Sequence, residues 1–393
     1  MPEKLLLSLR KFIAPEFVFG RGARGLAGRQ AAGLGVRRAL LVADPGLCPL
    51  GLPDEVAESL EASGIEYELF NALSSNPRDH EVMAGAMAFD ACACDAIVAV
   101  GGGSAMDCGK AIGIVSANKR HILEFEGVDN VPRPGPPLLC VPTTAGTGAE
   151  VSQFVIVTDT ARRLKIAIAS KSLIPDAALI DPEVTVSMPR DLTVNTGLDA
   201  LTHAMEAYVS NAHGPMTDLL ALESVRLIRT HLAAATVRPD DLEARGGMIL
   251  ASLYAGMAFS NAILGAVHAM AHSLGGLLDL PHGLCNAILL DHVVRYNYDA
   301  VPDRYATLGR LLGADFPDDA PPAKRKEAVL AAIAAFKAEL GVTQSLADIG
   351  VAASDIAALA QNAMADPCLL TNPRQPTVGE IESIYEQARR SGS

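Results

Sequence analysis

The chain changes its pattern of secondary structure close to residue 189. Before that point, short apolar runs alternate with helical patterns; one run spans residues 96–100, and a helical segment opens after Gly103. Such alternation is typical of a parallel sheet covered by helices. After Pro189 come long stretches rich in Ala and Leu, which predict helices alone. Because 393 residues exceed the usual limit of one hydrophobic core, we expect an α/β domain over residues 1–188 and an all-helical domain over residues 189–393.

The charge balance argues against two kinds of partner. The formal net charge is −13, and no run is rich in Lys and Arg. Nucleic acids and anionic membrane surfaces are both recognised by basic patches. We therefore expect small neutral or polar partners, and neither a nucleic acid nor a membrane.

Cysteine use and the apolar segments indicate where the protein resides. Seven scattered cysteines in a large chain predict reduced thiols, as in the cytoplasm. The apolar N-terminal stretch is interrupted by Arg10 and Lys11, so no export signal is expected. Residues 246–278 lack Asp, Glu, Lys and Arg and are long enough to span a membrane. Polar residues such as His268 and His272 favour instead a buried helix of a cytoplasmic protein.

A glycine cluster joins the apolar run at 96–100 to the helix that follows it. Gly101, Gly102 and Gly103 stand there, followed by Ser104. A helix N-terminus presents free backbone N–H groups and the positive end of the helix dipole, which together favour an anion. The cluster predicts a phosphate cradle, with Lys110 about two turns into the helix. The alternative is a tight strand-to-helix turn that binds nothing.

Two further polar segments follow predicted strands. The loop at 142–150, after the strand 138–141, contains three threonines among glycines: Thr143, Thr144 and Thr147. Asp44 follows the strand at 39–42, where a carboxylate can bind ribose hydroxyls and favour NAD over NADP. An ordinary turn before Pro45 would look the same. Because ligands bind at the carboxyl ends of strands in such sheets, the α/β domain is predicted to bind a dinucleotide.

Histidines at chelating spacings mark the helical half. Asp199 and His203 lie four residues apart, hence on one helical face. His268 and His272 repeat that spacing, and His282 follows after a glycine pair. Buried imidazoles need partners, and a divalent metal would supply a common one. Oxygen and nitrogen ligands suit Fe(II) or Zn(II). The alternative for each histidine is a hydrogen-bonded core residue.

Five segments together resemble one known family, the iron-containing (group III) alcohol dehydrogenases, which include lactaldehyde reductase and 1,3-propanediol dehydrogenase. The segments are GGGSAMDCGKAIG at 101–113, PTTAGTGAEVS at 142–152, GLDALTHAMEAY at 197–208, HAMAHSLGGLLDLPHG at 268–283 and CLLTNPR at 368–374. The resemblance covers nearly the whole chain. It implies the dehydroquinate synthase-like architecture, in which a dinucleotide-binding α/β domain precedes an all-α metal-binding domain.

The resemblance also implies roles for single residues. The implied metal ligands, with Fe(II) first and Zn(II) as the alternative, are Asp199, His203, His268 and His282. His272 would stand beside the metal as the catalytic proton carrier. The implied cofactor residues are Gly101, Gly102, Gly103, Ser104, Asp107, Thr143, Thr144, Thr147 and Lys165, with Lys110 supporting the loop. The implied lining of the alcohol pocket is Phe154, Phe259 and Cys368.

The expected function is oxidation of a small primary alcohol or diol, or reduction of the matching aldehyde, by hydride transfer with NAD. A homodimer or larger homo-oligomer is expected from the resemblance alone. Two alternatives are a dehydroquinate synthase-like lyase and a non-catalytic nucleotide-binding or metal-storage module. The segment at 268–283 argues against the lyase. Four chelating groups beside a cofactor cradle argue against a module without chemistry.

Overall fold

The computed structural model describes residues 11–390, and this part of the chain forms two compact units. The first, the α/β unit, spans residues 13–188; the second, the helical unit, spans residues 189–390 together with residues 11 and 12. Residues 11 and 12 therefore belong to the helical unit, although we expected them in the α/β domain. Residues 1–10 of that expected domain lie outside the described residues. The expected fold class, a parallel α/β domain followed by a helical domain, is confirmed.

A parallel sheet of six strands forms the α/β unit, in the order β1-β9-β6-β4-β2-β3. The strands are β1 (Glu16–Phe19), β2 (Arg38–Ala43), β3 (Glu66–Phe70), β4 (Ala96–Gly101), β6 (Leu138–Pro142) and β9 (Ala177–Ile180). Every neighbouring pair is parallel. Ala43 pairs with Val100, and Gly101 with Pro142, so β2, β4 and β6 end at the same edge.

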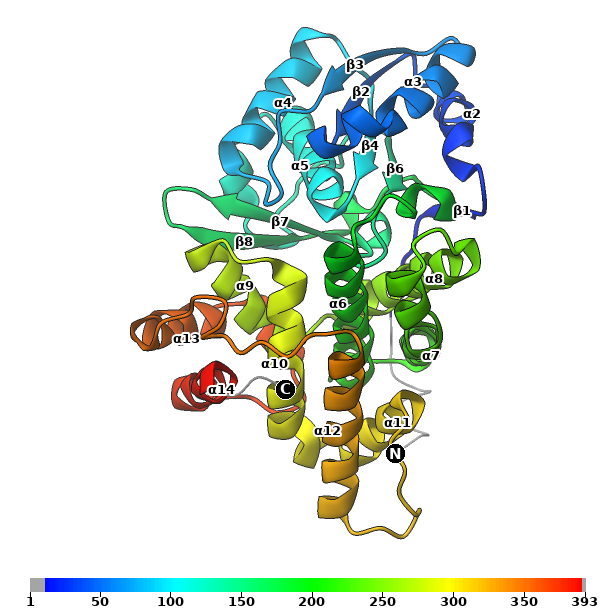
Figure 1. The fold of residues 1–393 in the computed structure, drawn as a ribbon. Coiled ribbons are helices and arrows are strands. Elements are labelled where there is room, and N and C mark those ends of the chain that lie inside the picture. Colours follow the sequence, from blue (N-terminus) through cyan, green and yellow to red (C-terminus); the bar gives the residue numbers. More distant parts are fainter. Residues whose placement is uncertain (1–10, 391–393) are drawn as a thin grey trace. The chain divides into compact units, whose positions relative to one another are not determined.

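Helices cover both faces of this sheet, which explains why its central strands are apolar throughout (Figure 1). The helices α2 (Ala27–Gly33) and α3 (Leu52–Ala62) pack on one face, where Val98 of β4 joins a core with Leu60. On the other face lie α4 (Asp79–Ala91) and α5 (Gly103–Asn118), where Ile97 joins a core with Met106. Successive residues of β4 therefore enter two different cores.

A second, smaller sheet completes the α/β unit. β7 (Phe154–Asp159) and β8 (Leu164–Ala169) form an antiparallel hairpin, and β5 (Gly127–Val128) pairs in parallel with β8. Val155 and Val157 of β7 are buried in the same core as α5. The hairpin thus lies against the helix that opens at the glycine cluster.

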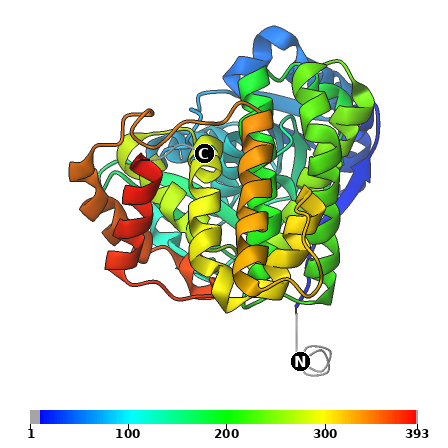
Figure 2. The ribbon, with the colours of Figure 1, turned by 60° about the horizontal axis from the view of Figure 1, so that its bottom comes forward.

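Helices alone build the second unit. They are α6 (Arg190–Val209), α7 (Pro215–Val237), α8 (Leu242–Ala262), α9 (Ala266–Leu278), α10 (His282–Asn297), α11 (Pro302–Leu312), α12 (Pro322–Glu339), α13 (Ile356–Met364) and α14 (Val378–Arg390). Pro189 is the N-cap residue of α6 and Pro281 that of α10, which is where proline is tolerated. Helix α10 packs against both α6 and α12, and these long helices run side by side in Figure 2.

Short 3₁₀ turns connect the longer elements. They are η1 (Ala23–Leu26), η2 (Pro45–Leu50), η3 (Ile122–Phe125), η4 (Ala149–Val151), η5 (Lys171–Leu173), η6 (Pro182–Thr185), η7 (Tyr298–Ala300), η8 (Ala353–Asp355) and η9 (Pro367–Thr371). Two of them involve predicted site residues, since η2 follows Asp44 and η9 contains Cys368.

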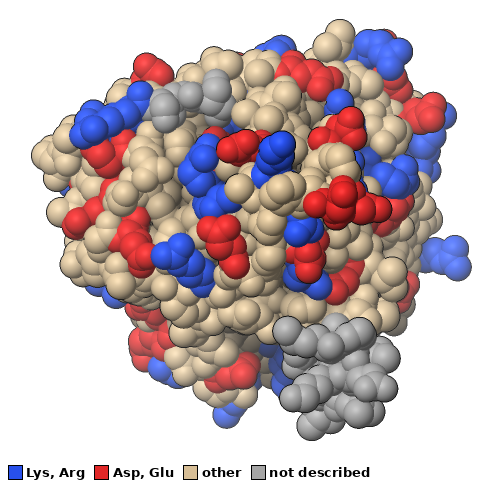
Figure 3. All heavy atoms as spheres, turned by 90° about the horizontal axis from the view of Figure 1, so that it is seen from below, with Lys and Arg blue, Asp and Glu red and all other residues tan. Residues whose placement is uncertain are grey.

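The uncharged stretch at 246–278 is divided between α8 and α9. Within the described chain, no single helix has both the length and the apolar character needed to cross a membrane. Only α8 and α9 taken together meet that criterion, and they are bent by 100°. On the face drawn in Figure 3, Lys and Arg side chains are interspersed with Asp and Glu side chains.

Candidate active site

The carboxyl ends of β2 and β4 adjoin where the strand order reverses. The chain runs from β2 outward to β3 and then returns to β4 on the other side of β2. Such a reversal opens a crevice outside the strand ends, where ligands of α/β proteins bind. Asp44 follows β2, and its backbone N–H donates to the Val100 carbonyl at 3.2 Å. The structure therefore brings Asp44 and the glycine cluster together, as the sequence predicted from separate motifs.

Asp44 also has a local role. Its Oδ1 accepts a hydrogen bond from the Gly46 N–H at 2.8 Å and thereby caps η2. This is the ordinary turn interaction that we named as the alternative. The cap leaves the second carboxylate oxygen available to a ribose hydroxyl, so the two roles are compatible.

The glycine cluster packs against the threonine loop, where a side chain at Gly101 or Gly103 would clash and one at Gly102 would be tightly packed. A Cβ at Gly103 would lie 2.7 Å from Cγ2 of Thr147, and one at Gly102 would lie 3.1 Å from Cγ2 of Thr144. Gly101 has φ +154°, and its Cβ would lie 2.6 Å from that of Ala105. The first N–H groups of α5 have no acceptor within the helix. The missing side chains thus keep these donors accessible, and the backbone fits a pyrophosphate.

Several predicted cofactor residues also hold this edge of the sheet together. The Thr143 N–H donates to the Gly101 carbonyl at 2.8 Å. The hydroxyl of Ser104 donates to the Ser75 carbonyl at 2.5 Å, and the Lys165 ammonium donates to Oδ1 of Asn76 at 2.8 Å. Segment 75–76 therefore lies beside the glycine cluster, although no sequence motif pointed to it.

Two charged side chains of α5, the buried Lys110 and the partly buried Asp107, bind the start of β7. The Lys110 ammonium donates to the carbonyls of Ser152, at 2.8 Å, and Phe154, at 3.1 Å. The Asp107 carboxylate accepts from the Ile156 N–H at 3.1 Å, and burial raises its pKa to about 6. Both side chains bind the start of β7. They thus join α5 to the start of β7, whereas the resemblance implied that they support the glycine loop at the N-terminus of α5.

In the helical unit, three histidines surround one carboxylate oxygen. Nε2 of His268 lies 3.5 Å from Oδ1 of Asp199, Nε2 of His282 at 3.7 Å and Nε2 of His203 at 3.9 Å. Helix α6 supplies Asp199 and His203 from one face, α9 supplies His268, and α10 begins with His282. Ligand atoms of Asp199, His268 and His282 all lie within 4.8 Å of one another, and His203 approaches the same carboxylate oxygen as the most distant of the four predicted ligands.

The geometry fits a divalent ion. Ligand atoms at the usual bond lengths of a tetrahedral ion lie about 3.4 Å apart, close to the separations found here. Burial raises the pKa of Asp199, but the imidazoles of His203, His282 and His268 outweigh it and hold the pKa well below its usual range. Burial lowers the pKa of His268, but hydrogen bonds to Asp199 and Glu206 outweigh it and raise that pKa to about 9. A cation is the natural partner of such a set.

Two neighbours of the ligands were missed by the sequence analysis. Oε2 of Glu206 accepts from Nδ1 of His268 at 2.6 Å, which directs Nε2 toward Asp199. The Asn286 amide nitrogen lies 2.6 Å from Oδ1 of Asp199 and 3.1 Å from Nε2 of both His268 and His282. The buried amide oxygen of Asn286 finds no hydrogen-bond donor among the described residues. Both residues stand on the same helical faces as ligands, at three or four residues from them, and that spacing was the available signal.

His272 lies beside the ligands without joining them. Its ring stacks on that of His282, with centroids 5.2 Å apart. Nδ1 of His272 is hydrogen-bonded to Oδ2 of Asp366 at 2.8 Å. Cys368 is buried close to this pair, and Phe259 stacks on His203 with ring centroids 4.5 Å apart. Phe154, the third predicted pocket residue, begins β7 in the α/β unit.

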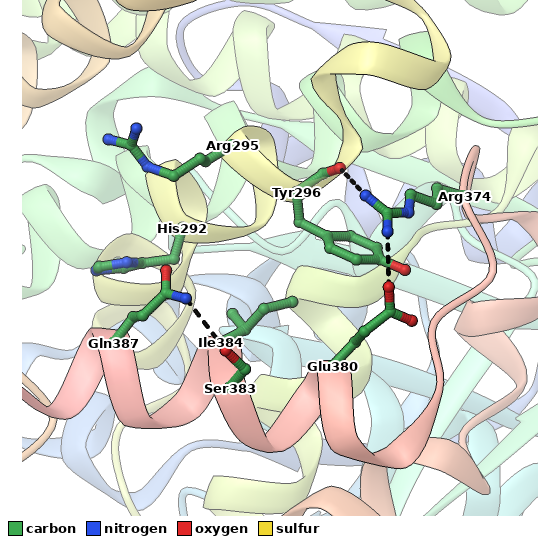
Figure 4. A pocket seen from close by; sticks show the side chains of 8 residues that line it. All are labelled: His292, Arg295, Tyr296, Arg374, Glu380, Ser383, Ile384 and Gln387. Carbon is green, nitrogen blue, oxygen red and sulfur yellow. Dashed lines mark hydrogen bonds and ion pairs between the residues drawn. The ribbon is translucent and has the colours of Figure 1, made fainter.

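Arg374, the last residue of the CLLTNPR segment, has a structural role (Figure 4). It lies over the Tyr296 ring at 4.0 Å, donates to the Tyr296 carbonyl at 3.3 Å and pairs with Glu380 at 2.6 Å. These contacts fix the segment between α10 and α14, beside a cavity of about 180 Å³. None of the predicted site residues lines that cavity.

The fold and the two sites define a class: a dinucleotide-type α/β unit followed by a helical unit with a buried metal-type ligand set. Comparison with known proteins narrows it. Residues 14–182 match the family described as iron-containing alcohol dehydrogenase, and residues 193–389 match the C-terminal part of the Fe-containing alcohol dehydrogenase family. The chain therefore belongs to the iron-containing alcohol dehydrogenase family.

Individual relatives agree over nearly their full lengths. The 1,3-propanediol dehydrogenase of Klebsiella pneumoniae is 41% identical over 94% of this chain and 96% of its own. The NAD-dependent methanol dehydrogenase of Bacillus methanolicus is 38% identical over 96% and 99%. A crystal structure of 1,3-propanediol oxidoreductase superposes with a TM-score of 0.94 at 40% identity, covering 97% of this chain and 100% of that one. The chain is an alcohol dehydrogenase, and the family resemblance found in the sequence is confirmed.

Proposed function

We propose that this chain interconverts small primary alcohols or diols and their aldehydes, with NAD as the hydride carrier and a divalent metal as the electrophile. The convergence of Asp199, His203, His268 and His282 around one point carries the proposal. Fe(II) is the first choice because of the family, and Zn(II) suits the same ligands. The methanol and 1,3-propanediol dehydrogenases among the relatives favour a short substrate.

The proposed reaction divides the chemistry between bound groups and side chains. A divalent ion in this ligand set would supply Lewis-acid polarisation of the substrate oxygen. A nicotinamide cofactor held by the glycine cluster and the threonine loop would supply the hydride acceptor. The alcohol also loses its hydroxyl proton, which His272 would accept; its ring stacks on that of the proposed ligand His282. Alcohol and NAD⁺ thus give aldehyde, NADH and one proton.

The remaining site residues would bind the cofactor and line the alcohol pocket. The glycine cluster and the threonine loop would hold the pyrophosphate and ribose, and Asp44 would favour NAD over NADP. Phe259 and Cys368 present apolar surface beside the histidines and would keep water from the reacting carbon. We further propose a cytoplasmic homodimer or larger homo-oligomer that binds neither nucleic acid nor membrane, from the acidic net charge and the family resemblance.

A spectrophotometric assay tests the proposal. Protein loaded with Fe(II) or Zn(II) should reduce NAD in the presence of short primary alcohols or diols, observed as the absorbance of NADH. A dehydroquinate synthase-like lyase or a non-catalytic module would give no net NADH. Failure with every alcohol, and with every aldehyde in the reverse direction, would overturn the proposal.

Two variants test the division of roles. His282→Ala removes one of four ligands and should lose both metal and turnover. His272→Ala should keep its metal and lose roughly 10²–10⁴-fold in rate, the usual contribution of one proton-transfer group. Elemental analysis measures the metal content of both variants, and steady-state kinetics measure their turnover. Full metal and activity in His282→Ala, or loss of metal in His272→Ala, would contradict the assignment.

A further inference from the structure

A buried pair lies next to the metal ligands and is not explained by metal binding. His272 of α9 and Asp366, which precedes η9, are 94 residues apart in the chain, and Nδ1 meets Oδ2 at 2.8 Å. Their side chains are 10% and 9% exposed. A charge-assisted hydrogen bond is strongest where water is excluded. The hydrogen bond with Asp366 therefore fixes the orientation of the His272 ring.

The other oxygen of Asp366 is anchored to the backbone. Oδ1 accepts from the Cys368 N–H at 2.8 Å, and a backbone amide can only donate. Oδ2 is thereby directed toward His272. Because an ionised carboxylate only accepts, Nδ1 of His272 carries the ring proton and Nε2 keeps its lone pair.

Hydrogen bonds fix the two segments that carry Asp366 and His272 relative to each other. Oδ1 of Asn372 accepts from the Ala266 N–H at 3.1 Å, and the Thr371 hydroxyl donates to the Leu264 carbonyl at 2.8 Å. These bonds join the segment after Asp366 to the start of α9, which carries His272. The orientation of the pair is therefore built into the fold of the helical unit.

We propose that Asp366 is a positioning residue that fixes the tautomer and the orientation of His272, so that Nε2 faces the reaction as the proton acceptor. The inference rests on the proposed function, in which His272 takes the alcohol proton. Asp366 is not one of the four proposed metal ligands, and in this proposal it acts on the reaction through its hydrogen bond to His272.

Asp366→Asn gives the sharpest test. The backbone N–H of Cys368 will still select an oxygen acceptor, so the new amide NH₂ faces His272 and donates to Nδ1. That reverses the tautomer and blocks Nε2 with a proton. In the Zn(II)-loaded enzyme, we expect a loss in kcat of roughly 10²–10⁴-fold, a nearly unchanged KM for the alcohol, and unchanged metal content. Nitrogen NMR of ¹⁵N-histidine protein, with His272 assigned by its loss in His272→Gln, should show Nδ1–H in the wild type and Nε2–H in the variant.

A matched control and a rescue variant complete the test. His213 and Asp218 form another histidine–carboxylate pair in the same unit, at 3.2 Å, and Asp218→Asn should leave kcat unchanged. Asp366→Glu retains an acceptor and should recover part of the lost kcat. Wild-type kcat in Asp366→Asn, loss of its metal, or an Nε2–H tautomer in the wild type would overturn the inference. If the wild type oxidises no alcohol, the proposed function fails, while the tautomer of His272 still decides the role of Asp366.

Discussion

Glu206 orients one of the predicted metal ligands, His268, through a direct hydrogen bond. Its Oε1 accepts from the Val267 N–H at 2.7 Å, at the N-terminus of α9, while Oε2 holds His268. A carboxylate is favoured there by the helix dipole. Gly265 makes room for it, since a Cβ at that position would lie 2.9 Å from Oε1 of Glu206. The start of α9 and the orientation of His268 are thus determined by the same residue.

In the proposed function, the preference for NAD over NADP rests on a single residue, Asp44. Asp44→Asn keeps the oxygen that caps η2 but removes the charge that would repel the 2′-phosphate of NADP. Like charges 4 Å apart near a protein surface repel by about 1–4 kcal/mol, so we expect the kcat/KM ratio of NADP to NAD to rise about tenfold or more. Steady-state kinetics with both cofactors measure it. Asp44→Gly, which also removes the cap, serves for comparison, and a wild type that prefers NADP would contradict the assignment.

At the scale of elements, the bend between α8 and α9 stores backbone strain. Ile263 has φ 63° and ψ −177°, a conformation that is essentially restricted to glycine. The two helices meet there at 100°, and the bend delivers His268 to the ligand set. This conformation costs about 1–3 kcal/mol, and the hydrogen bonds around the start of α9 compensate for that cost.

Substitution at Ile263 should reverse the usual order of alanine and glycine. Ile263→Ala shortens the side chain to a methyl group and Ile263→Gly removes it, but only glycine adopts this backbone freely. We expect Ile263→Gly to be the more stable, because relief of about 1–3 kcal/mol outweighs the glycine entropy cost of about 0.5–1 kcal/mol. Urea denaturation compares the two. Ala331→Gly, at an exposed position in α12, should show the ordinary destabilisation by glycine; the same order at Ile263 would exclude strain.

The threonine loop contains a carboxylate that should make stability depend on pH. Burial raises the pKa of Glu150 from its usual value of 4.5 to about 7. The folded state therefore binds the Glu150 proton more tightly than the unfolded state does. The resulting stabilisation of the fold is fully present at low pH and is lost as pH rises from 4.5 through 7. Between pH 5.5 and 8 the loss is about 2 kcal/mol. Glu150→Gln should remove that part of the slope in urea denaturation, and an unchanged slope would contradict the shifted pKa.

On the scale of the whole molecule, metal binding should stabilise the protein. All four predicted ligands lie in the helical unit, so a metal bound only to the folded state raises its unfolding free energy, by about 2.7 kcal/mol at a hundredfold excess over Kd. Removal by a chelator should lower Tm in calorimetry, and added Zn(II) should restore it. His282→Ala should show no such response. An unchanged Tm after complete metal removal would contradict the ligand assignment.

Much of this protein could be predicted because its signals are local. The apolar run before Gly101 and the spacing of Asp199 and His203 depend only on neighbouring residues, since strand and helix periods act over a few positions. The division into an α/β half and a helical half follows from the same periodicity. The family motifs then implied which residues would form the site.

The partners of those residues were decided by tertiary structure alone. Glu206 meets His268 across 62 residues, because α6 and α9 both pack against α10. Asp366 meets His272 across 94 residues, because η9 packs against α9. Asp44 meets the glycine cluster because β2 and β4 pair in a register that no local pattern encodes. The sequence by itself determined which groups could bind a metal or a phosphate. Their orientation depends on helices and strands distant in the chain, because a side chain is held by whatever packs against it.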